Sequence, residues 1–188
     1  MTIQGKVVLL GAAGAGKSAL LNRLCSDRFY DEELPTIGAA YATVSLQKDP
    51  PHTIGMWDTA GQERYSALAP MYYRNSDIAL IVYDITCRKS YERAWAWVDT
   101  LNNNQPGMVM LMIGAKLDLE ETRDVPVVEA AAAAERRGIT HIELSSKSGD
   151  NIDKLREWLL EQSKSLVIRQ PCRLPSPQSG RPNMERCC

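Results

Sequence analysis

A glycine-rich segment at residues 11–18, Gly-Ala-Ala-Gly-Ala-Gly-Lys-Ser, constrains the fold most, because it fits G-x-x-x-x-G-K-[ST] at every fixed position. It follows an apolar run at residues 6–10 and opens an amphipathic segment at residues 17–28, as a phosphate-binding loop between a strand and a helix would. Glycines let the backbone wrap around an anion, and the helix start supplies positive potential. We expect Lys17 to reach the β- and γ-phosphates of a nucleotide and Ser18 to bind Mg²⁺. The strand, lysine and serine together disfavour the alternative of an ordinary glycine-rich turn.

Short apolar runs alternate with amphipathic segments along the chain. The runs predict strands at residues 6–10, 39–47, 53–57, 78–83, 108–113 and 141–144, with a hairpin turn at residues 48–51. The amphipathic segments predict helices at residues 17–28, 91–101, 127–137 and 152–166. This alternation predicts an open α/β sheet that binds its ligand at the carboxyl ends of the strands.

Composition and charge exclude several classes of protein. The formal net charge is -1, which argues against a nucleic-acid-binding protein. No apolar run approaches the roughly 18 residues of a membrane-spanning helix, and the first residues resemble neither a signal peptide nor a myristoylation site. The five cysteines lack the spacing of a zinc site or a disulfide framework, so we expect the reducing cytosol.

The last twenty residues differ from the rest of the chain. Residues 169–188 carry four arginines against one glutamate and contain four of the ten prolines. They hold too little apolar surface to fold by themselves. We therefore divide the chain into a globular domain at residues 1–168 and a flexible tail at residues 169–188, which ends in Cys187 and Cys188.

A second motif, Asp58-Thr-Ala-Gly-Gln62, follows the apolar run at residues 53–57. Asp58 ends a predicted strand, where a carboxylate faces the phosphate site and can hold Mg²⁺ through water. Gly61 lets its backbone N–H approach a γ-phosphate, and Gln62 has the donor and acceptor groups to orient an attacking water. An ordinary turn is a weak alternative at this distance from residues 11–18.

Together these motifs resemble those of Ras-superfamily small GTPases over residues 4–166, and within them the Rab branch. The resemblance is carried by residues 11–18, 35–41, 57–65, 72–74, 82–86 and by the two terminal cysteines. Residues 36–40 and 68–74 are most similar to the early-endosomal Rab subgroup. The implied fold is the G domain of P-loop NTPases, a six-stranded, mostly parallel sheet flanked by about five helices.

The resemblance implies roles for further residues. Thr36 would bind Mg²⁺ and the γ-phosphate region, and Phe29 would pack edge-on against guanine. Residues 31–41 and 61–75 would be two switches that contact exchange factors, GTPase-activating proteins, a GDP-dissociation inhibitor and effectors. The effector surface would include the aromatic side chains Tyr41, Trp57 and Tyr72, for which core filling is the alternative.

The segment at residues 114–118 departs from the family pattern Asn-Lys-x-Asp. Asp118 is present, and its two acceptor oxygens match the N1–H and exocyclic amine of guanine. Lys116 is present and can cover the base plane, but Ala115 replaces the asparagine that contacts the base and the phosphate loop. The loss of such a hydrogen bond costs about 1–3 kcal/mol, so we expect weaker binding and faster exchange. The full expected set of nucleotide contacts is Ala13, Gly14, Ala15, Gly16, Lys17, Ser18, Ala19, Phe29, Thr36, Gly61, Ala115, Lys116, Asp118, Ser145, Ser146 and Lys147.

The expected reaction is hydrolysis of GTP to GDP and phosphate. Lys17, Thr36 and Gln62 are its expected catalytic residues, with Mg²⁺ held by Ser18, Thr36 and Asp58. Ala13, where many family members have glycine, crowds the γ-phosphate, and no arginine finger in cis is evident, so intrinsic hydrolysis should be slow.

The resemblance also implies geranylgeranylation of Cys187 and Cys188, since two lipids anchor a protein stably to a membrane. The expected role is a switch for vesicle traffic on the cytosolic face of early endosomes, with a share of the protein in the cytosol. An interaction scaffold with impaired hydrolysis or nucleotide binding is the alternative, because Ala13 and Ala115 depart from the family. An ATP-using P-loop kinase is a weaker one, since Asp118 opposes adenine.

Overall fold

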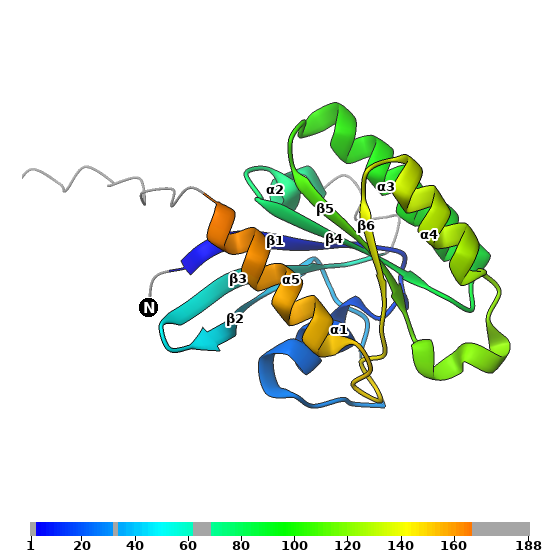
Figure 1. Cartoon of the computed structure of the whole chain (residues 1–188), viewed down its shortest axis with the longest axis horizontal. Coiled ribbons are helices and arrows are strands. Elements are labelled where there is room, and N and C mark those ends of the chain that lie inside the picture. The colour runs from blue at the N-terminus through cyan, green and yellow to red at the C-terminus, as the bar shows by residue number, and fades with distance from the viewer. Residues whose placement is uncertain (1–2, 32–33, 62–68, 167–188) are drawn as a thin grey trace, which may run out of the picture.

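The computed structural model of the chain describes residues 3–31, 34–61 and 69–166 (Figure 1). In this part a six-stranded sheet has the order β2-β3-β1-β4-β5-β6, in which only the β2–β3 pair is antiparallel. The strands are β1 (Ile3–Gly11), β2 (Ala39–Lys48), β3 (Pro51–Thr59), β4 (Ile78–Asp84), β5 (Val109–Ala115) and β6 (Thr140–Glu143). The predicted α/β class, the six strands and the hairpin are therefore confirmed.

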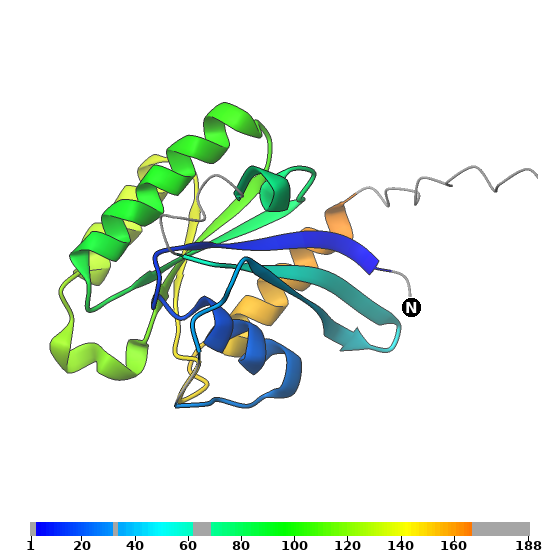
Figure 2. The ribbon, with the colours of Figure 1, turned by 180° about the vertical axis from the view of Figure 1, so that it is seen from behind.

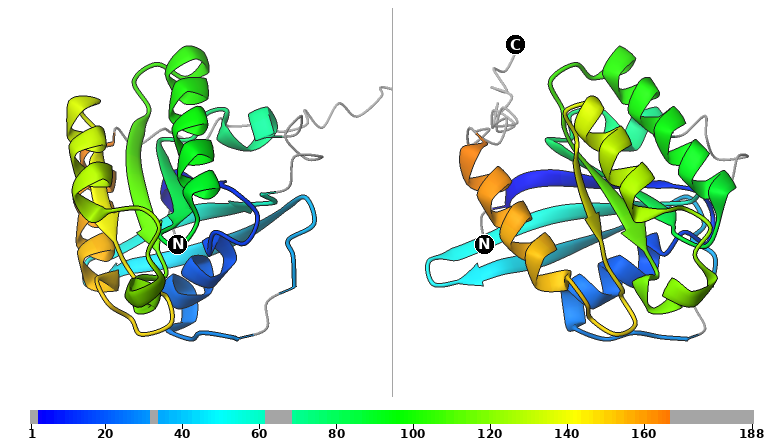
Figure 3. Two further views of the ribbon diagram at one scale, coloured as in Figure 1. Left: turned by 90° about the vertical axis from the view of Figure 1, so that its right-hand side faces the viewer. Right: turned by 45° about the vertical axis from the view of Figure 1, so that its right-hand side comes forward.

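Among the residues that the structure describes, five α-helices flank the sheet on its two faces (Figure 3). They are α1 (Lys17–Ser26), α2 (Ala69–Tyr73), α3 (Arg88–Asn104), α4 (Val127–Arg136) and α5 (Ile152–Ser165), and a 3₁₀ segment, η2 (Leu117–Thr122), follows β5. Helices α1 and α5 form one apolar core with one face of the sheet, while α3 and α4 form the second core with the other face. No helix among the described residues has both the length and the apolar character that crossing a membrane requires.

Strand β1 shows how the sequence builds both cores. Val7 and Leu9 point into the core shared with α1 and α5, while Val8 and Leu10 point into the core shared with α3. All four side chains are fully buried, which is why the run is continuously apolar rather than alternating. The N-terminal end of β1 lies beside the β2–β3 turn (Figures 1 and 2), so its carboxyl end delivers residues 11–18 to the opposite end of the sheet.

Several elements differ from their predicted bounds. Helix α1 ends at Ser26 because Asp27 takes a left-handed conformation, with φ of 55°, and its N–H caps the helix by donating to the carbonyl of Arg23. Strand β5 extends to Ala115, two residues beyond the predicted end, because Gly114 and Ala115 pair with the neighbouring strand β4. The short elements α2 and η2 were not predicted, since neither is long enough to show a helical period.

Candidate functional site

Residues 11–18 form a tight loop between β1 and α1, and glycine is required at both ends of its turn. Gly11 has φ of 145°, and a Cβ atom there would lie 2.1 Å from the Val82 carbonyl oxygen. Gly16, with φ of 99°, is the N-cap of α1, so the helix starts directly at Lys17. The loop therefore presents the N-terminus of α1 to a cavity of about 470 Å³.

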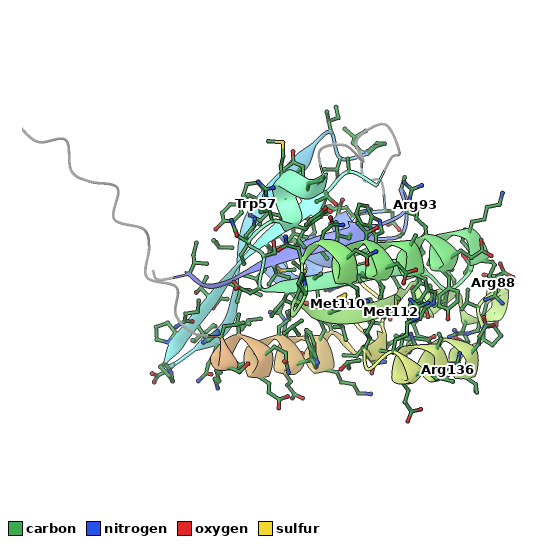
Figure 4. The ribbon with its side chains drawn as sticks, turned by 90° about the horizontal axis from the view of Figure 1, so that it is seen from above. Trp57, Arg88, Arg93, Met110, Met112 and Arg136 are labelled. Atoms are coloured by element: carbon green, nitrogen blue, oxygen red, sulfur yellow. The ribbon has the colours of Figure 1, made fainter. Side chains whose placement is uncertain are left out.

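Lys17 lies buried beneath this loop. Its Nζ donates to the carbonyl oxygens of Gly11 and Ala12, at 3.2 and 2.7 Å. Burial lowers the pKa of Lys17 to about 8, with the nearby Asp58 carboxylate opposing the shift and Arg93 adding to it. Arg93, on α3, is thus a second cation near Lys17, which the sequence alone did not indicate (Figure 4). A phosphate group would supply the negative charge that this buried ammonium lacks.

Three oxygen-bearing side chains converge beside Lys17. The Ser18 hydroxyl donates to Asp58 Oδ2 at 2.6 Å, the Thr36 hydroxyl donates to the same oxygen at 3.0 Å, and the two hydroxyls lie 2.9 Å apart. Asp58 is buried, and its Oδ1 has no hydrogen-bond partner in the described structure. Mg²⁺ binds through one or two carboxylates, hydroxyls and substrate phosphates rather than an all-protein cage. The residues present fit that requirement, so the predicted metal ligands lie together.

The first predicted switch segment contacts the start of the second at this end of the site through the residue before it. The N–H of Ala60, one residue before the second segment, donates to the carbonyl of Gly38, in the first segment, at 2.9 Å. Gly61 lies directly against the phosphate loop, where an added Cβ would be 2.4 Å from Ala12 C and Ala13 N. Glycine is thus the one residue type that this close approach admits. Gln62 lies outside the described residues, so its predicted role stays a prediction.

The other end of the cavity is formed by the loops after β5 and β6. The Ser145 hydroxyl donates to Asp118 Oδ1 at 2.5 Å and accepts the N–H groups of Lys147 and Ser148 at 3.1 and 3.0 Å. Ser145 is fully buried and does not line the cavity, so it orients Asp118 from behind. Asp118, Ser146 and Lys147 line the cavity directly.

Lys116 is fixed by a partner that the motif search did not identify. It takes a left-handed conformation, with φ of 67°, and its Nζ lies 2.6 Å from Asp84 Oδ2. Burial alone would raise the pKa of Asp84, but hydrogen bonds from Lys116 and Thr86 hold it below its ordinary value. The sequence signal is an acidic residue at the carboxyl end of an apolar strand, the same signal that identified Asp58.

Ala115 ends β5 and faces the phosphate loop. Its side chain is buried, and its Cβ would lie 3.5 Å from a Cβ atom added to Gly16. The position is therefore the one from which a polar side chain could join the base-binding loop to the phosphate-binding loop. A methyl group makes no such hydrogen bond, and the expected weakening of nucleotide binding stays a prediction.

Most predicted nucleotide contacts share the single cavity between these loops. Phe29 lines it, with Lys147 Nζ 5.9 Å from the centre of its ring. Ala15 and Ser145 are buried behind the wall. Sequence reasoning did not name six wall residues as nucleotide contacts: Tyr30, Asp31, Leu34, Pro35, Thr59 and Leu119. The remaining predicted contacts on the wall are Ala13, Gly14, Gly16, Lys17, Ser18, Ala19, Thr36, Gly61, Ala115, Lys116, Asp118, Ser146 and Lys147.

The three aromatic side chains of the predicted effector surface contact one another. The ring centres of Tyr41 and Trp57 lie 5.0 Å apart, and those of Trp57 and Tyr72 lie 5.9 Å apart. Trp57 is half-buried against the core on the α3 side, near α2 (Figure 4), whereas Tyr41 is exposed. Trp57 therefore fills part of the core, while Tyr41 is displayed on the surface.

Comparison with known proteins places this geometry in a family. A model of the Ras family matches residues 6–165. Ras-related protein RABF2b of Arabidopsis thaliana is 41% identical over 177 residues, 93% of this chain and 87% of that protein. Ras-related protein Rab5 of Nicotiana tabacum is 43% identical over 93% of this chain and 86% of its own, and human Ras-related protein Rab-31 is 39% identical over 97% and 96%. The chain therefore belongs to the Ras family, as a small GTPase of its Rab branch that binds GTP and hydrolyses it.

Proposed function

We propose that the cavity binds GTP with Mg²⁺ between the loops at residues 11–18 and those after β5 and β6. One observation carries this assignment: a single cavity of about 470 Å³ is lined by the phosphate-binding residues Lys17 and Ser18 at one end and by Asp118 at the other. A nucleotide has the same order of groups, with phosphates at one end and a base at the other.

Asp118 recognises guanine through its two carboxylate oxygens, which accept from the N1–H and the exocyclic amine. Adenine cannot make this pair, because its N1 is an acceptor. The Ser146 N–H binds the guanine oxygen, Lys116 covers the base plane, and Lys147 supports the pocket wall next to Phe29.

Ser18, Thr36 and Asp58 would hold Mg²⁺, which would neutralise charge on the phosphate oxygens. Lys17 stabilises the same phosphates with its buried ammonium. Gln62 orients the water that attacks the γ-phosphorus, the bond to the β–γ bridging oxygen breaks, and GDP and phosphate result. The Ala13 methyl group crowds this end, so hydrolysis is slow until an activating protein supplies an arginine.

The protein is a GTP-binding switch in endosomal vesicle traffic, which its Rab5-type relatives support. Residues 31–41 and 61–75 contact its exchange factor, activating protein, GDP-dissociation inhibitor and effectors. The tail at residues 169–188 tethers the globular domain to the cytosolic face of the early endosome through geranylgeranyl groups on Cys187 and Cys188. Both cysteines lie outside the described residues.

Nucleotide extraction and titration calorimetry test the binding assignment. The purified chain should release GDP or GTP on denaturation, bind GDP with Mg²⁺, and fail to bind ADP at the same concentration. Asp118→Ala should abolish the preference for GDP, whereas the matched change Asp153→Ala, on the exposed side of α5, should not. A chain that purifies without nucleotide, or binds ADP equally well, would contradict the assignment and favour the scaffold alternative.

A further inference from the structure

Arg23 is a residue of α1 that reaches the base-binding loop. Only 14% of its side chain is exposed. Its Nε donates to the Ser146 carbonyl at 2.6 Å and its Nη2 donates to the Lys147 carbonyl at 2.8 Å, across 123 and 124 residues of sequence. Helix α1 begins at Lys17 and Ser18, so one helix contacts both ends of the cavity.

The peptide group between Ser146 and Lys147 is held from both sides. Arg23 binds its carbonyl oxygen, and the Ser145 hydroxyl oxygen accepts its N–H at 3.1 Å. The same Ser145 hydroxyl donates to Asp118 Oδ1 at 2.5 Å. A continuous hydrogen-bonded path therefore runs from the guanidinium of Arg23 through one peptide group and Ser145 to the Asp118 carboxylate.

The side chain of Ala115 provides no alternative hydrogen bond between the base-binding loop and the phosphate loop. Ala115 faces Gly16 with a methyl group, so it makes no side-chain hydrogen bond to the phosphate loop. Arg156, on α5, also contacts α1, but it donates to the carbonyls of Arg23 and Leu24 rather than to the base-binding loop. Hydrogen bonds to a charged donor are about twice as strong as neutral ones, which suits Arg23 to holding two carbonyls at once.

We propose that Arg23 is a positioning residue for guanine recognition: it holds residues 145–147 on α1 so that the Asp118 carboxylate and the Ser146 N–H face the base. The inference rests on the proposed function, in which Asp118 accepts from the guanine amine. Without Arg23 the loop is free to move away from α1, and the contacts to the base weaken while those to the phosphates remain.

Release rates of GDP and inosine diphosphate (IDP), which lacks the exocyclic amine, test this role. Arg23→Gln should speed GDP release about tenfold, the effect of losing a charged hydrogen bond. IDP release should speed up by a smaller factor than GDP release, because IDP lacks the amine contact to Asp118 but keeps its N1–H and oxygen contacts. Arg23→Lys should lie between the wild type and Arg23→Gln, since one ammonium cannot take the place of Nε and Nη2 together. This conservative variant also carries the test if Arg23→Gln does not fold.

Arg156→Gln is the matched control, because Arg156 is a guanidinium on α5 that contacts α1 but not the base-binding loop. It should leave the ratio of GDP to IDP release rates at the wild-type value. Equal acceleration of GDP and IDP by Arg23→Gln, no acceleration of GDP, or an equal change of the ratio in Arg156→Gln would overturn the proposal. Equal release of GDP and IDP by the wild type would instead show that Asp118 does not recognise the amine, and would overturn the proposed function itself.

Discussion

Two arginine–glutamate pairs in this protein have the same geometry and different burial, which permits a controlled prediction. Arg123 donates through both Nη atoms to Glu143, at 2.8 and 2.7 Å, with side-chain exposures of 13% and 9%. Arg88 donates through both Nη atoms to Glu129, at 2.5 and 2.8 Å, with exposures of 39% and 42% (Figure 4). Replacement of Arg88 by alanine breaks this one bidentate pair, whereas replacement of Arg123 also breaks its two hydrogen bonds to the exposed Glu120.

The expected losses of stability differ because Glu143 is left buried without a cation, whereas Glu129 is left in water. Removal of Arg123 leaves the Glu143 carboxylate buried without its cation and also removes hydrogen bonds to Glu120 and to the Val125 carbonyl. Loss of one partner from a mostly buried pair costs about 3 kcal/mol. Removal of Arg88 leaves Glu129 in water, where an exposed ion pair contributes little to stability. For a domain of this size, the Arg123 cost corresponds to a fall in Tm of about 6–12 °C.

Urea and thermal unfolding of Arg123→Ala and Arg88→Ala, both with GDP and Mg²⁺ in excess, measure the difference. The GDP affinity of each variant is determined separately, because bound ligand adds to apparent stability by mass action. The double change Arg123→Ala/Glu143→Ala should regain part of the lost stability, since it removes the unpaired carboxylate. Equal losses in the two single variants would refute the argument that burial decides the cost.

Further predictions concern the site and its surroundings. Ala115→Asn should slow GDP release about five- to 150-fold, because the carboxamide can form the missing hydrogen bond. Stopped-flow measurement of GDP release checks this, and equal rates for the variant and the wild type would contradict it. Asp58→Asn should raise the Mg²⁺ concentration needed for tight GDP binding at least tenfold, measured by calorimetry with the magnesium-independent binding as baseline. Burial lowers the pKa of His141, so as the pH falls the unfolded chain binds a proton at this residue before the folded chain does. The free energy of unfolding should therefore fall below about pH 6.5, and fall less in His141→Gln. Urea unfolding at a series of pH values measures both. An identical pH dependence in that variant would exclude His141 as the cause.

Local sequence was sufficient for the phosphate end of the site. Residues 11–18 are consecutive, so their spacing alone fixes the loop, and Gly11 and Gly16 indeed take backbone angles that other residues rarely adopt. Asp58 and Asp118 could be placed because each follows a buried strand, whose end must lie at the same edge of the sheet. The fold class followed from the same alternation of apolar runs and amphipathic segments.

Contacts across long stretches of sequence were not predictable in this way. The bonds from Arg23 to Ser146 and from Arg123 to Glu143 join residues 123 and 20 positions apart. Neither arginine has a spacing or a neighbour that distinguishes it from a solvent-exposed cation. Their partners are defined only by the tertiary fold, in which α1 packs beside the loop after β6 and the end of η2 lies beside β6 itself. Sequence therefore predicted most residues that line the cavity, but not the residues that hold them in place.

The two ends of the site are held in different ways, and this difference suits a switch. Asp118 and Ser145 belong to a hydrogen-bonded network anchored on β5, β6 and α1. Thr36, by contrast, is held through its hydroxyl by Ser18 and Asp58, while its neighbours Leu34 and Ile37 expose their side chains to solvent. In the proposed function, a γ-phosphate and its metal would act directly on Ser18, Thr36 and Asp58. Binding at the base end would then set how long a nucleotide stays, and the phosphate end would set the conformation that partners encounter.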